Sequence, residues 1–355
     1  MMANPWNVKA LLVVGGLSLV LVSSAAGAPP AVSTDLERLG MRLYKDRNLS
    51  FNGTQSCQTC HHPISGFADP RNAHAPETSV VSVGADGVSL GGRNAPSAAY
   101  AGYSPQLALT NGEWVGGLFW DGRASGSLLG DPLAEQAFGP PLNPVEMAME
   151  DEAAVVAVIR QAEYRRLWVR AFGAASLESV EAAFTMFGVA VAAYERSADL
   201  TRFRSRYDLA RDAFEPAEIR GLALFETHCA GCHSTEPSFG AVAPLFTNYH
   251  YANLGVPPNP LLISSQPDLG LGAVVGDEGH DGKFKVPTLR NVAKTAPYSH
   301  NGRFATLREM VEFVNDRSGY EAEVPRNVAT SVGSLGLDDN DVDDLVSFLR
   351  TLDDE

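Results

Sequence analysis

The stretch Cys57-Gln58-Thr59-Cys60-His61 decides the fold, and it recurs as Cys229-Ala230-Gly231-Cys232-His233. In a CXXCH motif two thiols add to the vinyl groups of a porphyrin, and the adjacent histidine reaches the iron as its proximal ligand. The two copies use all 4 cysteines of the 355 residues. The motifs therefore predict two covalent c-type haems, with His61 and His233 as iron ligands.

Two other roles of the cysteines stay open at this point. Zinc also takes thiolate and imidazole ligands, so the two motifs are alternatively halves of one four-thiolate cluster. A disulfide within either CXXC pair is the other alternative. Such a bridge is strained and usually redox-active, and no thioredoxin-like βαβ pattern surrounds either copy.

The length of 355 residues favours two domains of ordinary size, one for each motif. We expect a signal peptide at residues 1–28, an N-terminal cytochrome c-like domain at 29–212 and a C-terminal one at 213–355. The charge of Lys9, the apolar run 11–22 and the small residues after it predict the signal, and the run is too short to span a membrane. Because bacteria attach c-type haem outside the cytoplasm, we expect the mature chain in the periplasm.

The chain is acidic, with 27 basic against 42 acidic residues and a net charge of −15. This balance argues against nucleic acid and against an anionic membrane surface as partners. The surplus of carboxylates suits either a solvated surface or the docking of a basic redox partner.

Hydrophobic periodicity predicts a mainly α-helical protein with long loops and little β-structure. Gly- and Pro-rich stretches at 63–105 and 234–285 are expected to be loops around the haems. Helices are expected at 34–46, at 151–162, at 179–194, from Glu215 to the second motif, after the capping box Thr306-Leu307-Arg308-Glu309, and after Asp338.

Taken together, the residues resemble the bacterial di-haem cytochrome c peroxidase and MauG family over nearly all of the mature chain. The resemblance implies two mainly helical cytochrome c-like domains with one haem each. The N-terminal haem then meets hydrogen peroxide, and the C-terminal haem receives electrons from outside. Besides the two CXXCH motifs, the matching runs are Arg93–Ser97, Phe119–Arg123, Asn143–Met147, Val286–Val292 and Thr295–Gly302.

The resemblance also implies roles for three residues near the peroxide. Gln136 and Glu146 match the two distal-pocket residues and keep the family's ten-residue separation, and Trp120 matches the relay between the haems. An insertion within 126–132 lengthens the interval from Trp120 to Gln136. Chemistry supports Glu146 independently, because cleaving HO–OH needs a group that takes a proton from one oxygen and returns it to the other.

Further matches concern ion binding. Asn94 and the main-chain oxygens of Thr295 and Pro297 match an interhaem calcium site, and oxygen ligands of this kind suit a hard cation. Arg93 and Arg290 are expected partners of the haem propionates, with ordinary salt bridges as the alternative.

The chain departs from the family pattern beside the second haem. The axial position, which is Met in the peroxidases and Tyr in MauG, is Val314 here, and an aliphatic side chain cannot ligate iron. Met310 lies one helical turn earlier on the same face and is the candidate ligand, with a place in the helix core as its alternative. Thr227-His228 also replaces the tryptophan that precedes the second motif in MauG.

These features favour a peroxidase that reduces hydrogen peroxide to water with electrons from a small cytochrome c or cupredoxin. The alternatives are a MauG-like oxidation of residues in a partner protein and a non-enzymatic di-haem electron carrier. A carrier needs neither Gln136 nor Glu146. The sequence leaves the electron donor open, and a homodimer is one option for the assembly.

Overall fold

The computed structural model describes residues 34–262 and 266–355, so the predicted signal peptide at 1–28 lies outside the described residues. The first half of the chain has eight α-helices and one hairpin, with long loops between α3 and β1 and between β2 and α4. They are α1 Asp35–Lys45, α2 Cys57–Cys60, α3 Pro70–His74, β1 Ala108–Thr110, β2 Glu113–Val115, α4 Pro132–Gln136, α5 Gly139–Leu142, α6 Glu152–Gln161, α7 Arg165–Phe172 and α8 Val180–Glu195.

The second half has fewer α-helices, and its loops are also long. Its elements are α9 Arg206–Leu209, α10 Pro216–His228, β3 Tyr251–Ala252, α11 Leu271–Val275, β4 Phe284–Lys285, α12 Leu307–Asn315 and α13 Asp339–Arg350. The strands form two antiparallel pairs, β1 with β2 and β3 with β4. The prediction of a mainly helical fold is confirmed.

The six predicted helices begin where local capping chemistry places them. The Thr34 side chain accepts from the amide of Glu37 at the start of α1, and Ser179 accepts from Ala182 at the start of α8. Thr306 and Glu309 form the predicted capping box of α12. Such caps satisfy amides that have no partner within the helix, so these boundaries are readable from sequence alone.

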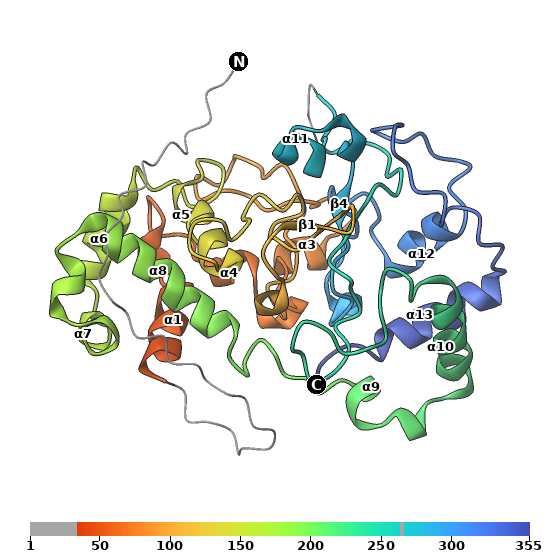
Figure 1. The fold of residues 1–355 in the computed structure, drawn as a ribbon, viewed down its shortest axis with the longest axis horizontal. Helices are drawn as coiled ribbons and strands as arrows, with labels where there is room; N and C mark the ends of the chain where they lie inside the picture. The colour runs from red at the N-terminus through yellow and green to blue at the C-terminus, as the bar shows by residue number, and fades with distance from the viewer. Residues whose placement is uncertain (1–33, 263–265) are drawn as a thin grey trace. The chain divides into compact units, whose positions relative to one another are not determined.

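Each half repeats one arrangement, in which the helix before the CXXCH motif crosses a later helix (Figure 1). In the first half α1 crosses α8, and a methyl group added to Gly40 would overlap the carbonyl oxygen of Ala190. In the second half α10 crosses α13, and a methyl group at Gly221 would overlap the carbonyl oxygen of Asp344. Because glycine has no Cβ, the helix backbones can approach this closely.

Each of the two CXXCH motifs packs against its own hydrophobic cluster. Cys57 packs against the first cluster and Cys229 against the second. The clusters do not follow the halves strictly, since Leu245 and Tyr249 of the second half belong to the first cluster. Residues of the second half therefore contribute to the hydrophobic core of the first half.

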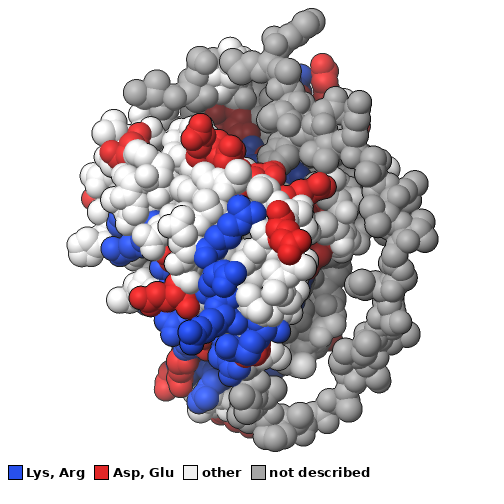
Figure 2. Space-filling view, turned by 90° about the vertical axis from the view of Figure 1, so that its left-hand side faces the viewer, with Lys and Arg blue, Asp and Glu red and all other residues white. Residues whose placement is uncertain are grey.

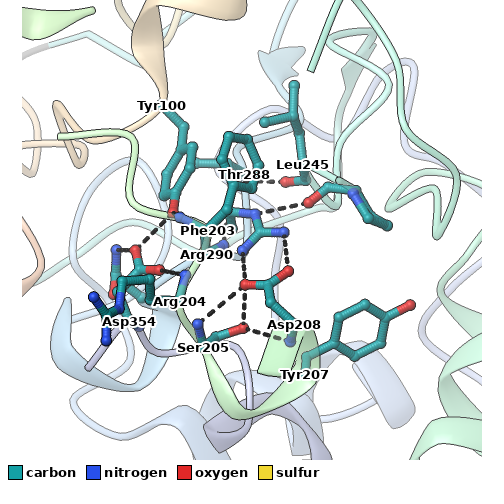
Figure 3. Close-up of polar contacts among 12 residues, drawn as sticks. Tyr100, Phe203, Arg204, Ser205, Tyr207, Asp208, Leu245, Thr288, Arg290 and Asp354 are labelled. Carbon is teal, nitrogen blue, oxygen red and sulfur yellow. Dashed lines mark hydrogen bonds and ion pairs between the residues drawn. The ribbon is translucent and has the colours of Figure 1, made fainter. Parts of the chain in front are cut away.

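A buried polar network joins the halves around Arg290 (Figure 3). The Arg290 guanidinium donates to both carboxylate oxygens of Asp208, at 2.8 and 2.9 Å. The Arg290 side chain is fully buried, and that of Asp208 is 8% exposed. Beside this pair, Tyr100 donates to the carboxylate of Asp354 at 2.7 Å, and the Arg204 amide donates to the same carboxylate at 2.9 Å.

Asp208→Ala is expected to lower the free energy of unfolding by about 3–5 kcal/mol, because Arg290 would keep a buried charge without its partner. Burial raises the pKa of Asp208, but the hydrogen bonds and charge of Arg290 outweigh it, so the net pKa is lowered. The pair therefore contributes at neutral pH, and its contribution is lost in acid as the carboxylate protonates. Urea unfolding of the haem-loaded protein measures the change.

The matched control is Asp343→Ala, which removes an exposed carboxylate paired with Arg308. An exposed ion pair contributes about 0–1 kcal/mol, so this variant is expected to unfold almost like the wild type. Equal changes in the two variants would mean that the buried Arg290 pair contributes no more to stability than an exposed one.

Candidate active site

The first CXXCH motif forms the short helix α2, and His61 follows it directly. Nδ1 of His61 lies 3.1 Å from the carbonyl oxygen of Phe67. A carbonyl oxygen only accepts, so Nδ1 carries the proton and Nε2 keeps its lone pair for a metal. Tyr44 of α1 donates to the His61 carbonyl at 3.1 Å, and burial lowers the pKa of the imidazole.

The second motif is held in the same way. Nδ1 of His233 lies 2.8 Å from the carbonyl oxygen of Phe246, which again leaves Nε2 free, and burial lowers the pKa of this imidazole too. Cys229, Cys232 and His233 line a mostly apolar cavity of about 380 Å³. An apolar cavity with two thiols and one oriented imidazole on its wall fits a covalently attached haem.

Neither alternative for the cysteines is seen within the part of the chain that the structure describes. No disulfide joins the four cysteines, and no group of three or more His, Cys, Asp or Glu side chains lies together among the described residues. Burial also raises the pKa of Cys60 to about 11 and that of Cys229 to about 12. Buried neutral thiols are poor zinc ligands and poor redox nucleophiles.

Glu146 lies in a turn beside the first motif. Its backbone amide donates to the Asn143 carbonyl at 3.0 Å, and the Asn143 side chain donates to its Oε1 at 2.6 Å. Burial raises the pKa of Glu146 and outweighs the opposing effects of Asn143 and Arg123. Burial is the largest cause of the raised pKa of Cys57 and Cys60, and the negative charge of Glu146 raises both pKa values further. Because such an effect of charge requires proximity, the carboxyl lies near both thiols.

Gln136 is the last residue of α4, which Asp131 caps by accepting from the amides of Leu133 and Ala134. The cap sets where this five-residue helix begins, and because the helix is short it also sets the position of Gln136 at its end. The Gln136 side chain is half-buried.

Trp120 lies on the wall of the second cavity, together with His233. Its indole Nε1 donates to the carbonyl of Asn94 at 2.9 Å, and its own carbonyl accepts from the amide of Lys285 at 2.8 Å. The first half therefore fixes the indole and the second half fixes the backbone of Trp120, despite the insertion that follows it.

The three residues of the predicted calcium site come together on the same cavity wall. Asn94, Thr295 and Pro297 all line it, although 200 residues of sequence separate the first from the others. The Asn94 amide donates to the carbonyl of His300 at 2.8 Å, which ties the two segments together.

The two arginines expected at haem propionates have carboxylate partners within the protein. Arg93 pairs with Asp121 and Asp268, each at 2.6 Å, and Arg290 pairs with Asp208 as described above. Arg290 also lines the second cavity. Contact with a propionate stays a prediction for both.

Sequence reasoning missed two buried polar groups beside Trp120. Lys285 is buried and donates to the carbonyl of Gly117 at 2.7 Å, and burial lowers its pKa to about 7. His300 stacks on Phe284 with ring centroids 3.6 Å apart, and its Nε2 lies 3.9 Å from the carboxylate of Glu323.

A third missed group is Glu195 at the end of α8. It is buried, its Oε2 has no partner among the described residues, and burial raises its pKa to about 8. The pKa of Cys57 is raised most by burial and next by the negative charge of Glu195. The Glu195 carboxyl therefore also lies near the first motif. The signal in the sequence was an acidic residue, Glu195, at the end of the otherwise apolar run 186–194.

Met310 and Val314 both line the second cavity and pack against the second hydrophobic cluster. If Met310 ligates the second haem iron, Met310→Leu should abolish a near-infrared charge-transfer band between its thioether and ferric iron, because leucine cannot ligate. Near-infrared absorption of the oxidised protein measures it. The control is Met186→Leu on α8, and a wild type without the band would assign Met310 to the helix core.

Comparison with known protein families and structures assigns the chain to a family. The family model described as di-haem cytochrome c peroxidase matches residues 34–213, and the cytochrome c model matches residues 219–353. The chain belongs to the di-haem cytochrome c peroxidase family. It is an oxidoreductase of the peroxidase type with two c-type haems, and the resemblance read from the sequence is confirmed.

Two curated relatives show the breadth of the family. The methylamine utilization protein MauG of Paracoccus denitrificans is 41% identical over 368 residues, which cover 94% of this chain and 93% of the relative. The cytochrome c551 peroxidase of Nitrosomonas europaea is 32% identical over 285 residues, covering 79% of this chain and 72% of the relative.

The fold is similar to that of the diheme peroxidase BthA of Burkholderia thailandensis. The TM-score is 0.81 and the identity 32%, with 92% of this chain and 87% of that chain covered. Within the described residues, no helix is both long and apolar enough to cross a membrane.

Proposed function

We propose that this protein is a periplasmic peroxidase that reduces hydrogen peroxide to water with electrons from a small cytochrome c or cupredoxin. The observation that carries this proposal is the half-buried carboxyl of Glu146 beside the first CXXCH motif. An electron carrier has no need of a titratable group at this point, whereas cleavage of peroxide does.

The reaction consumes one peroxide, two electrons and two protons and gives two waters. A c-type haem supplies the iron that binds peroxide and that accepts and passes on electrons. Glu146 removes the proton from one peroxide oxygen and delivers it to the other, so that water leaves instead of hydroxide. Asn143 keeps the carboxyl oriented through its 2.6 Å hydrogen bond, and Gln136 is the proposed second contact to peroxide.

Trp120 is the proposed electron relay between the haems. Trp120→Phe is expected to leave oxidation of the first haem by peroxide intact but to slow the arrival of the second electron. Stopped-flow absorbance of both haems measures the two phases. Trp114→Phe on β2 is the matched control, and traces identical to wild type in Trp120→Phe would make Trp120 a core aromatic only.

Three further features belong to the proposal. A calcium ion held by Asn94, Thr295 and Pro297 would stabilise the cavity wall that carries Trp120. The domain boundary is proposed near residue 212, between α8 and α10. Export to the periplasm rests on the predicted signal at 1–28.

A second candidate function is peroxide-dependent oxidation of residues in a partner protein, and the 41% identity to MauG supports it. Steady-state assays of the haem-loaded protein separate the two. Peroxide consumption with reduced cytochrome c or cupredoxin as the only electron source supports the first. Turnover that requires a specific protein substrate, with neither donor oxidised, would replace it by the second.

A further inference from the structure

The insertion within 126–132 forms a loop that is hydrogen-bonded to α4. The buried carboxylate of Glu135, on α4, makes these bonds. Its Oε2 accepts from the amide of Gly126 at 2.8 Å, and its Oε1 accepts from the amides of Leu128 and Leu129, each at 2.7 Å. One side chain of the helix therefore holds three main-chain amides of the inserted loop.

The inserted loop is a compact turn whose side chains face solvent. The amide of Gly130 donates to the carbonyl of Gly126 at 2.9 Å, and the side chain of Gln106 donates to the carbonyl of Gly130 at 2.8 Å. The side chains of Leu128 and Leu129 are exposed. Hydrogen bonds to the main chain therefore attach this loop to α4, and packing of its leucine side chains contributes little.

The helix α4 depends on contacts of this kind for its position. A helix of five residues is too short to be stable by itself. It packs against α8 (Figure 1), where a methyl group added to Gly188 would come within 2.5 Å of the carbonyl oxygen of Ala134. At its start, Asp131 pairs with Arg196 at 2.6 Å. Glu135 makes the third contact, at the end of α4 that carries the distal glutamine.

The side chains of Glu135 and Gln136 have separate surroundings. Successive residues of a helix are about 100° apart around its axis, so the two side chains leave α4 in different directions. Among the residues that the structure describes, none is hydrogen-bonded to the half-buried side-chain amide of Gln136. This amide is available to a ligand, and Glu135 can affect that ligand only through the position of the helix.

We propose that Glu135 is a positioning residue, which holds Gln136 at the peroxide site by binding α4 to the inserted loop. The inference rests on the proposed function for the role of Gln136, whereas the hydrogen bonds of Glu135 are a feature of the fold. Because the insertion lengthens the chain before α4, this end of the helix needs such an attachment. A contact that is misplaced by about 1 Å can lower a rate by about a hundredfold.

The first test is Glu135→Gln, since glutamine has the same size but only one side-chain oxygen. Its NH2 group would face an amide that also donates, so at least one of the three hydrogen bonds is lost. Stopped-flow absorbance of the haem-loaded protein gives the second-order rate at which peroxide oxidises the first haem. We expect this rate to fall by about tenfold to a hundredfold. Denaturing mass spectrometry should still show both haems.

A double-mutant cycle separates positioning from a general effect on the structure. Gln136→Leu is made alone and together with Glu135→Gln. If Glu135 acts through Gln136, Glu135→Gln should cause no further loss once Gln136→Leu is present. The same fractional loss in both backgrounds would overturn the proposal, and so would a wild-type rate in Glu135→Gln when Gln136→Leu is slow.

The second readout is the infrared stretch of carbon monoxide bound to the reduced first haem, because distal hydrogen-bond donors act on a bound diatomic ligand. Glu135→Gln should shift this band in the same direction as Gln136→Leu, and it should cause no shift in the Gln136→Leu background. The measurement needs no peroxide. A wild type that does not consume peroxide would therefore contradict the peroxidase proposal, whereas a wild-type band in Glu135→Gln would contradict the positioning role.

The matched control is Glu218→Gln on α10. The Glu218 side chain is buried like that of Glu135, with exposed fractions of 8% and 9%, and it too accepts from a main-chain amide, that of Glu215 at 2.8 Å. This variant should keep the wild-type rate and band. Equal effects in the two glutamine variants would mean that any lost buried carboxylate disturbs the first haem, and the proposal would fail.

Leu128→Pro decides the test if Glu135→Gln does not retain its haems. Proline has no amide hydrogen, so this variant removes one of the three donors and leaves the carboxylate intact. The Leu128 side chain is 67% exposed, and its φ is not in the left-handed region, so no core contact is lost. We expect a smaller loss of rate and a smaller shift of the band in the same directions. Wild-type values of both would overturn the proposal.

Discussion

Glu146→Gln is expected to slow peroxide reduction by about a hundredfold or more, the usual scale for loss of general acid–base catalysis. Glutamine keeps the size of the side chain, and it can still accept from Asn143, but it can neither take nor return a proton. The haem spectra should persist, because neither CXXCH motif is altered. Steady-state turnover at saturating donor measures the loss.

The pH profile separates catalysis from a structural role. Burial raises the pKa of Glu146, so its basic form appears only above the usual pH range of a glutamate. The acid limb of kcat/KM in the wild type should follow this titration and should vanish in Glu146→Gln. Glu150→Gln, four residues further on and exposed, is the control. Unchanged turnover in Glu146→Gln would remove this residue from the mechanism.

Replacing Cys57 and Cys60 together by serine is expected to remove one covalent haem and all peroxide turnover. Serine hydroxyls do not add to the porphyrin vinyl groups, and the peroxide site is proposed at the first motif. Denaturing mass spectrometry should give two haem masses on the wild type and one on the variant. This readout is independent of activity.

The matched variant replaces Cys229 and Cys232 by serine. It should also lose one haem but keep the first haem's reaction with peroxide in a single-turnover experiment, because the proposed role of the second haem is electron delivery. If that variant lost the peroxide reaction and the Cys57 and Cys60 variant kept it, the roles of the two motifs would be reversed. A wild type that carries zinc and no porphyrin would contradict both assignments.

The features that could be predicted from the sequence are those set by residues close together in the chain. The two CXXCH motifs lie within five residues each, and the caps at Thr34, Ser179 and Thr306 act within three residues. These signals predicted the cofactors, the mainly helical class and six helices. The position of Glu146 near the first thiols was predicted too, but from the family resemblance and not from physics.

The relative placement of distant segments was decided only by the tertiary structure. Gly40 is unremarkable in sequence, and its role appears only where α8 crosses α1. The pairing of Arg290 with Asp208 spans 82 residues, and no periodicity reports a contact of that kind.

Net charge follows from the sequence alone, whereas the arrangement of charged side chains on the surface follows from the tertiary structure. The sequence by itself determined a net charge of −15, which is a sum over all residues and holds in any fold. Only the packing of α7 against α1 decided that basic side chains from 35–47 and 160–170 lie on one face (Figure 2). The physical reason is that chemistry within one turn of chain is set by neighbouring residues, whereas a surface or a buried pair is set by which segments the folded core brings together.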